Sequence, residues 1–278
     1  MKKILVVFSG PKFLFHVLEQ AISLAREDGS LLVGVFLRPP TPSEIIYPFI
    51  NEASSVSNAF YLDEAGSEEA VLIKAQVTLF SDTCLANKVR FATHLEGGTP
   101  VHELLKESVF ADLIVIDAKA DLYGASPSLL TTSLREFLAD SHCPVLVVHE
   151  KAQPVENTIL TYDGSASSMH AIKMYSYLFA SQLQKPAFLV CVDEGPHSDL
   201  PNSDKINSWL GQHFTNLQTD VLTGDTKNVL SAYINKHQHN SIVVMGAYGR
   251  SAVSRMFRQS LANYIISQTT IPLFITHG

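Results

Sequence analysis

Hydrophobic positions along this chain follow two alternating patterns. Short continuous apolar runs, such as Leu31 to Leu37 and Ala187 to Val192, are typical of strands buried on both faces. Between them lie segments with helical spacing. In the first of these, apolar residues recur every three or four positions from Phe13 to Ala25, and Gly29 follows as a predicted stop. Strands that alternate with helices predict an α/β fold with a doubly wound parallel sheet.

The alternation occurs twice. The run that starts at Ile4 resembles the run that starts at Ile159, 155 residues later, whereas Cys143 to His149 resembles Ile271 to His277 at an offset of 128. The first half therefore has 27 additional residues, which we place within Pro39 to Ala70. We predict two five-stranded parallel-sheet domains, residues 1–150 and 155–278, each with the order β-α-β-α-β-α-β-α-β.

Composition and charge exclude several classes of function. The net charge is −7, and neither half has the basic excess of a nucleic-acid-binding protein. No apolar run reaches the roughly 20 residues that span a bilayer. The three cysteines, Cys84, Cys143 and Cys191, are scattered and odd in number, which argues against a disulfide framework or a zinc site. We expect a cytoplasmic protein that contacts neither membrane nor nucleic acid.

The most informative motif follows the apolar run that ends at Val244. Gly246 and Gly249 form a G-x-x-G turn, which lets backbone N–H groups approach an anion closely. Residues 256–268 have helical spacing, so Ser260 is expected near a helix start, where the helix dipole favours negative charge. Residues 1–150 carry a charge of −8 and residues 151–278 a charge of +1. The second half is therefore the better candidate for binding a nucleotide.

This layout resembles the universal stress protein family in its tandem form. Nucleotide-binding members carry G-x2-G-x9-G-[ST] after the fourth strand, matched here by Gly246, Gly249, Gln259 and Ser260, with Gln259 in place of the third glycine. The resemblance also matches an Asp at the end of the first strand to Asp163, and an apolar residue at the end of the second strand to Val192. It implies an adenine nucleotide alpha hydrolase-like fold, with the two domains paired through their last strands as an intramolecular pseudo-dimer.

The resemblance implies that the second half binds ATP, ADP or AMP, with Mg²⁺ accompanying a triphosphate. Three residues leave alternatives open. Gln259 either obstructs the phosphates or donates an amide hydrogen bond to them. Arg250 either neutralises phosphate or belongs to a solvated loop. Asp163 either contacts the nucleoside or only forms an Asp-Gly turn.

The first half departs from the motif. At an offset of 128, the motif residues Gly246, Gly249, Gln259 and Ser260 correspond to Ala118, Asp121, Thr131 and Thr132. At the offset of 155 between the first strands, Asp163 corresponds to Phe8. A carboxylate about 4 Å from a phosphate charge costs on the order of 4 kcal/mol at an effective dielectric constant of about 20. We therefore expect no nucleotide in the first half.

The expected activity is binding without turnover, because no nucleophile motif and no P-loop lysine is present. The leading hypothesis is a stress-response protein that holds an adenine nucleotide and signals through protein partners, whose identity the sequence does not give. The alternative is a scaffold or interaction module that needs no nucleotide. Formation of a homodimer of the two-domain chain is left open.

Overall fold

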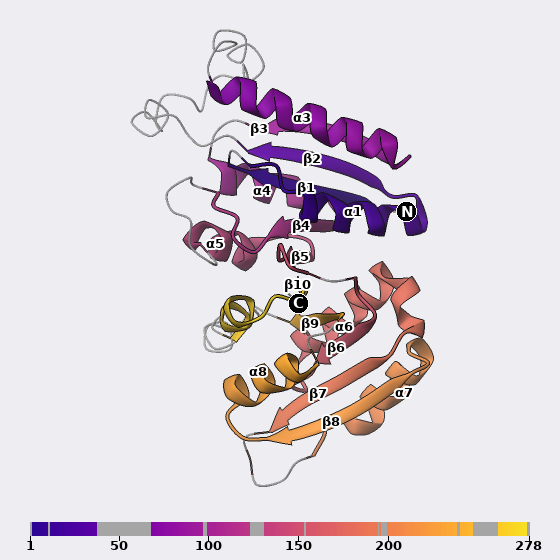
Figure 1. The fold of residues 1–278 in the computed structure, drawn as a ribbon. Coiled ribbons are helices and arrows are strands. Elements are labelled where there is room, and N and C mark those ends of the chain that lie inside the picture. Colours follow the sequence, from indigo (N-terminus) through magenta and orange to yellow (C-terminus); the bar gives the residue numbers. More distant parts are fainter. Residues whose placement is uncertain are drawn as a thin grey trace. The chain divides into compact units, whose positions relative to one another are not determined.

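The computed structural model describes residues 2–10, 12–37, 68–96, 99–122, 131–152, 154–193, 195, 199–237, 240–246 and 261–276. The chain divides into two compact units, Met1–Asp140 (unit 1) and Ser141–Gly278 (unit 2). Each unit alternates strands with helices, as the sequence predicts (Figure 1). Within the described residues, no helix has both the length and the apolar character needed to cross a bilayer.

Unit 1 is built on four parallel strands in the order β3-β2-β1-β4. Its elements are β1 (Lys3–Ser9), α1 (Phe15–Asp28), β2 (Leu31–Leu37), α3 (Glu68–Ala86), β3 (Arg90–Glu96), α4 (Pro100–Ser108), β4 (Leu113–Asp117) and α5 (Thr132–Asp140). The expected strand at Leu31 to Leu37 is confirmed residue for residue. Helix α1 ends at Gly29, which adopts the left-handed conformation of a C-cap, as expected.

Unit 2 has the strand order β5-β10-β9-β6-β7-β8. Its elements are β5 (Val145–Val148), β6 (Asn157–Thr161), α6 (Ala166–Leu178), η2 (Ala180–Gln184), β7 (Ala187–Asp193), α7 (Ser203–His213), β8 (Leu217–Thr223), α8 (Thr226–Lys236), β9 (Ser241–Gly246) and β10 (Leu273–Thr276). Residues 261–268 are also helical. The pairs formed by β6, β7, β8, β9 and β10 with one another are parallel.

Strands β5 and β10 pair antiparallel, with Leu273 opposite Val147 and Ile275 opposite Val145. This confirms the expected contact between the last strands of the two sequence repeats. Because β5 pairs with β10, the compact units separate after Asp140, whereas the sequence repeats separate near residue 150.

The additional residues of the first repeat lie between β2 and β3. That connection runs from 38 to 89, whereas the corresponding connection between β7 and β8 runs from 194 to 216. Part of the difference is helix length, since α3 has 19 residues and α7 has 11. Most of the expected insertion, from Pro39 to Ser67, lies outside the described residues.

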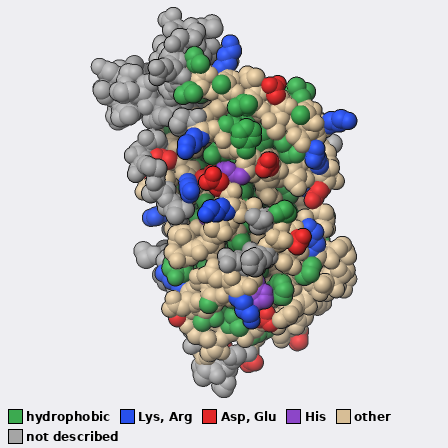
Figure 2. Space-filling model, in the orientation of Figure 1, with side chains coloured by type: hydrophobic (Ala, Val, Ile, Leu, Met, Phe, Trp, Pro, Cys, Tyr) green, Lys and Arg blue, Asp and Glu red, His purple; other side chains and the backbone are tan. Residues whose placement is uncertain are grey.

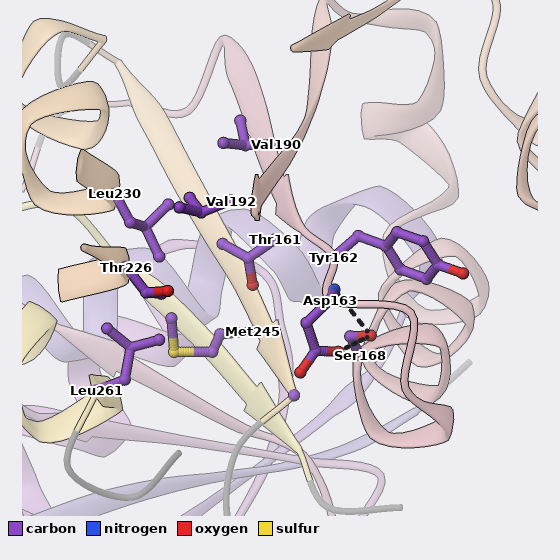
Figure 3. A pocket seen from close by; sticks show the side chains of 11 residues that line it. Thr161, Tyr162, Asp163, Ser168, Val190, Val192, Thr226, Leu230, Met245 and Leu261 are labelled. Atoms are coloured by element: carbon purple, nitrogen blue, oxygen red, sulfur yellow. Dashed lines mark hydrogen bonds between the residues drawn. The ribbon is translucent and has the colours of Figure 1, made fainter. Parts of the chain in front are cut away.

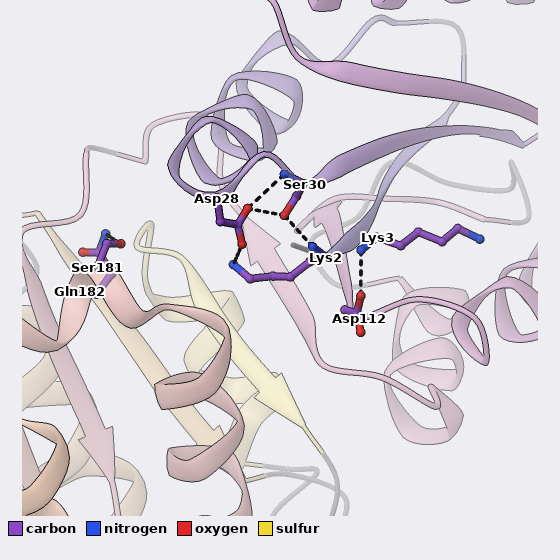
Figure 4. A network of polar contacts seen from close by, with 7 residues as sticks. All are labelled: Lys2, Lys3, Asp28, Ser30, Asp112, Ser181 and Gln182. Carbon is purple, nitrogen blue, oxygen red and sulfur yellow. Dashed lines mark hydrogen bonds and ion pairs between the residues drawn. The ribbon is translucent and has the colours of Figure 1, made fainter.

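A polar network fixes the start of β1 (Figure 4). The Lys2 ammonium lies 2.9 Å from the Asp28 carboxylate at the end of α1, and Ser30 donates to the same carboxylate through both its backbone N–H and its hydroxyl. The Lys3 N–H donates to Asp112 at 2.8 Å. Burial alone would raise the pKa of Asp28, but the hydrogen bonds from Ser30 and Lys2 hold that pKa below its usual value.

Candidate functional site

A pocket lies at the carboxyl ends of β6, β7 and β9 in unit 2 (Figure 3). The carboxyl ends of parallel strands meet at one edge of the sheet, which is where doubly wound folds bind ligands. The residues that line the pocket are Thr161, Tyr162, Asp163, Ser168, Val190, Val192, Thr226, Leu230, Met245, Gly246 and Leu261. Three of the predicted site residues, Asp163, Val192 and Gly246, are therefore brought together.

Asp163 lies two residues after the end of β6 and is exposed. Its Oδ1 accepts hydrogen bonds from the Ser165 N–H at 3.0 Å and from the Ser168 hydroxyl at 2.7 Å. Gly164 has a φ of 78°, a value that favours glycine and allows the sharp turn into α6. Asp163 thus forms the Asp-Gly turn and also lines the pocket, so the two interpretations of this residue are compatible.

The first turn of α6 is capped beside Asp163. The Ser165 hydroxyl accepts a hydrogen bond from the Ser168 N–H at 3.1 Å, which satisfies one of the free N–H groups at the helix start. The Tyr162 ring points away from the apolar wall of the pocket (Figure 3). Burial raises the pKa of Tyr162, so this phenol stays neutral. Asp163 is therefore the acidic group that lines the pocket.

The remaining wall is mainly apolar. Leu230 and Met245 are buried, Val192 is half-buried, and Thr226 lies one turn before Leu230 on α8. The sequence did not point to Thr226, Leu230 or Met245. Met245 precedes Gly246 in the motif, and a spacing of four on the helix after β8 places Thr226 and Leu230 on one face. These two signals were available in the sequence.

Gly246 is required by packing at the end of β9. A Cβ atom on this residue would lie 2.5 Å from the Ser167 carbonyl carbon and 2.7 Å from the Ser168 backbone nitrogen, and closer still to the Ser167 carbonyl oxygen. Only glycine lets the strand approach the first turn of α6 this closely. The first glycine of the motif therefore has a structural role that needs no ligand.

The other residues predicted for the phosphate loop are Gly249, Arg250, Gln259 and Ser260. All four lie outside the described residues. Residues 261–268 are helical, which agrees with the expected helix over 256–268 for its described part.

The corresponding edge of unit 1 is filled with aromatic rings. Phe8 of β1 is the register partner of Phe36 of β2. In unit 2 the last paired residues of β6 and β7 are Thr161 and Val190. Two residues further on, the same register places Asp163 beside Val192. Phe8 is buried and stacks on Phe13 and on Phe36, with ring centroids 4.9 Å apart in both pairs. Phe80 from α3 meets Phe8 edge-on at 5.8 Å.

Unit 1 has a buried carboxylate at the end of β4, whereas β9 of unit 2 ends with the first glycine of the motif. Asp117 is the last residue of β4, as Gly246 is of β9, and it contacts His16, the second residue of α1, as Gly246 contacts the second residue of α6. The His16 Nε2 to Asp117 Oδ2 distance is 2.6 Å. Both residues thus end the fourth strand of their repeat, one position from the match to Ala118 that an offset of 128 gives.

The loop after β4 is held by hydroxyl groups of its own unit. The Thr131 hydroxyl donates to the Ala120 carbonyl at 2.7 Å, and the Leu122 N–H donates to the Ser133 hydroxyl at 2.9 Å. These backbone groups of the loop are therefore satisfied without an anion. Together with the aromatic rings, they explain why unit 1 differs from unit 2 at this edge.

No group of three or more His, Cys, Asp or Glu side chains suited to holding a metal ion occurs in the described parts of the chain. Cys191 is buried beside the pocket. Burial raises the pKa of its thiol, and the nearby Asp163 and Asp193 raise it further. This thiol therefore has little thiolate character at neutral pH.

The sequence model of the Universal stress protein family matches residues 1–149 and again residues 156–277. No curated protein matches the chain. A universal stress protein from Archaeoglobus fulgidus DSM 4304 has a similar crystal structure, with 16% identity and a TM-score of 0.69 over 99% of this chain and 96% of that one.

A putative universal stress protein from Pseudomonas aeruginosa UCBPP-PA14 is 14% identical, with a TM-score of 0.63 over 99% of this chain and 92% of that one. At these identities the similar structures show the fold alone. The family is shown by the two sequence matches, which together cover most of the chain. The chain belongs to the universal stress protein family, in a tandem form with two copies of the family domain.

Proposed function

We propose that unit 2 binds an adenine nucleotide, such as ATP, ADP or AMP, at the pocket above β6, β7 and β9, and that the bound state is recognised by protein partners. One observation carries this proposal. The strand ends that leave a pocket in unit 2 bear Asp163 and Val192, whereas the same positions in unit 1 bear the stacked rings of Phe8 and Phe36. One repeat has kept room for a ligand and the other has filled it.

The chemistry of the pocket fits the nucleoside part. Val192, Leu230 and Met245 offer an apolar wall to a flat base, and a few polar groups at such a wall set orientation. The Asp163 carboxylate would accept a hydrogen bond from a ribose hydroxyl or from the adenine amino group. Its existing bonds to Ser165 and Ser168 hold it in place for that contact.

The phosphates would extend from Gly246 toward Gly249, Arg250, Gln259 and Ser260, which supply backbone N–H groups, a guanidinium, an amide and a hydroxyl. Mg²⁺ would bind to the phosphate oxygens of a triphosphate. Asp163 is the one carboxylate among the described pocket residues, and we assign it to holding the nucleoside. We therefore propose binding without turnover.

The test is equilibrium binding of ATP to the full chain, with and without Mg²⁺, by calorimetry. The decisive variant is Val192→Phe, which copies Phe36 of unit 1 into the pocket of unit 2. We expect affinity to fall at least about tenfold, which corresponds to about 1.4 kcal/mol. The matched control is Leu95→Phe, the same aromatic residue on an exposed position of β3, which should bind ATP like wild type.

A second variant, Gly249→Asp, tests the loop, since a carboxylate near the phosphates should abolish binding of ATP. If wild type fails to bind at millimolar ATP, or if both variants bind as wild type does, the nucleotide proposal is wrong. The alternative of a nucleotide-independent interaction module would then remain.

A further inference from the structure

Hydroxyl groups line the pocket of unit 2 at several places, and they have different tasks. The Thr161 hydroxyl donates to the Val244 carbonyl at 3.0 Å, and the Ser168 hydroxyl donates to Asp163 Oδ1 at 2.7 Å. These two hydroxyls therefore use their protons to hold a strand and a turn in place. Thr226 brings a further hydroxyl to the pocket, from the first residue of α8.

The connection from β8 to α8 fixes where Thr226 lies. The Gly224 N–H donates to the carbonyl of Asp193, the last residue of β7, at 3.2 Å. Asp225 is the N-cap of α8, and its carboxylate accepts a hydrogen bond from the Asn228 N–H at 3.0 Å. One bond joins the connection to β7, and the other closes the first turn of the helix. The backbone therefore holds Thr226, which follows Asp225, near the carboxyl end of β7.

Thr226 and Asp163 lie on opposite sides of Thr161 in the close-up view (Figure 3). The buried side chains of Leu230 and Met245 lie on the Thr226 side. A purine nucleoside that leaves its ribose at Asp163 and places its flat rings on this apolar wall extends toward Thr226. The edge that meets Thr226 is then the edge farthest from the ribose, which in adenine carries the amino group at ring position 6.

Unit 1 has no hydroxyl at the first position of the matching helix. Helices α4 and α8 each follow the third strand of their repeat, and α4 begins with Pro100 where α8 begins with Thr226. Four residues later both helices carry a buried leucine, Leu104 and Leu230. The packing residue is thus shared by the two units, whereas the hydroxyl occurs in the unit that has the pocket.

We propose that Thr226 is a further nucleotide-binding residue, whose hydroxyl accepts a hydrogen bond from the adenine 6-amino group. This inference rests on the proposed function, because it needs the base to fill the pocket of unit 2. A hydroxyl donates one hydrogen bond and accepts two, so Thr226 can bond to the base and keep a bond within the protein. Beside the buried Leu230 and Met245, an amino group without such a partner would be left unsatisfied, which is unfavourable.

The test compares two ligands that differ only at ring position 6: AMP, and purine riboside 5′-monophosphate, which has hydrogen in place of the amino group. Calorimetry with the full chain measures both affinities. We expect wild type to bind AMP about fivefold more tightly. Thr226→Val keeps the shape of the side chain and removes the hydroxyl, so it should lower the affinity for AMP and bring the ratio of affinities to about one. Thr226→Ser keeps the hydroxyl and should retain the preference.

The matched control is Thr219→Val, which makes the same change at an exposed position of β8 and should bind both ligands like wild type. On the face that Figure 2 shows, charged and hydrophobic side chains are interspersed over unit 2, so one added valine creates no extended apolar patch. Urea unfolding followed through Trp209 fluorescence shows whether each variant folds. Thr226→Ala removes the same hydroxyl and takes the place of Thr226→Val if the latter does not fold.

Two results overturn this inference alone. If wild type binds AMP but shows no preference between the two ligands, the 6-amino group has no partner in the pocket. If Thr226→Val leaves the preference unchanged, including by an equal loss of affinity for both ligands, Thr226 does not contact that group. If wild type binds neither AMP nor ATP at millimolar concentrations, the proposed function fails, and this inference fails with it.

Discussion

Replacing Gly246 by alanine should destabilise unit 2 even when no nucleotide is present. The added Cβ atom would lie within 3.0 Å of three backbone atoms at the first turn of α6, and backbone cannot rotate away as a flexible side chain can. Overpacking typically costs about 1–3 kcal/mol, and a clash with backbone belongs at the upper end of that range. We expect a loss of about 3 kcal/mol.

Urea unfolding measures this loss. The chain has a single tryptophan, Trp209, which lies in α7, so its fluorescence reports on unit 2. At a slope of about 2 kcal/mol per M, a loss of about 3 kcal/mol lowers the unfolding midpoint by about 1.5 M. The matched control is Gly211→Ala, in the same helix as Trp209. Gly211 is exposed, and no atom lies within 4 Å of a Cβ added to it. The Gly211→Ala variant should therefore be more stable than wild type by up to about 1 kcal/mol, because alanine favours the helix.

The two glycine substitutions differ only in surroundings, so opposite signs are the specific expectation. If Gly246→Ala unfolds at the wild-type midpoint, the close approach of β9 to α6 does not set the need for glycine. If both substitutions destabilise equally, the effect of Gly246→Ala is not specific to its surroundings and the packing argument fails.

Three further predictions concern other parts of the chain. Phe8→Ala should destabilise unit 1 by about 3–5 kcal/mol, measured by far-UV circular dichroism in urea, because it empties the centre of the aromatic stack. Asp28→Asn should be less stable than wild type at neutral pH. Because the folded pKa of Asp28 is lowered, the difference should be complete above about pH 4 and should vanish as the pH falls through the folded value, in urea titrations at several pH values. Tyr175→Phe should cost about 1–3 kcal/mol because the buried Thr158 hydroxyl, 2.9 Å from the Tyr175 hydroxyl, loses that partner, whereas adding Thr158→Val should recover part of the loss in tryptophan-monitored unfolding.

Strands buried on both faces could be located from the sequence, and edge strands could not. The run from Leu31 to Leu37 is continuous and apolar because β2 lies between two strands and beneath helices. By contrast, β8 (Leu217–Thr223) lies at the edge of its sheet and mixes polar with apolar residues, most of them partly exposed. Its sequence lacks the apolar run that marks a buried strand, so only the repeat indicated that a strand exists there.

The candidate site was predictable where a residue lies just after a strand, as Asp163 does. For residues that reach the pocket from a helix, the spacing of four shows that Thr226 and Leu230 share a face of α8, but it does not show that this face turns toward the strand ends. The aromatic filling of unit 1 was missed for a related reason. Phe8 was recognised as a replacement of Asp163, but its contact with Phe80 joins residues on opposite sides of the long insertion.

The strand-end residues, more than the glycine signature, lead us to expect a ligand in unit 2 and none in unit 1. Two matched positions differ between the units, Phe8 against Asp163 and Phe36 against Val192, and the fourth strands end differently, β4 at Asp117 and β9 at Gly246. The first two changes replace small or polar side chains by rings that stack into the space. Asp117 is a buried carboxylate at the end of β4, 2.6 Å from His16 Nε2, and we expect it to oppose the approach of an anion there. A glycine at the end of the fourth strand can be kept for helix packing alone, so its presence does not by itself indicate a ligand, whereas the stacked rings of Phe8 and Phe36 occupy the strand ends of unit 1 that match the pocket residues Asp163 and Val192 of unit 2.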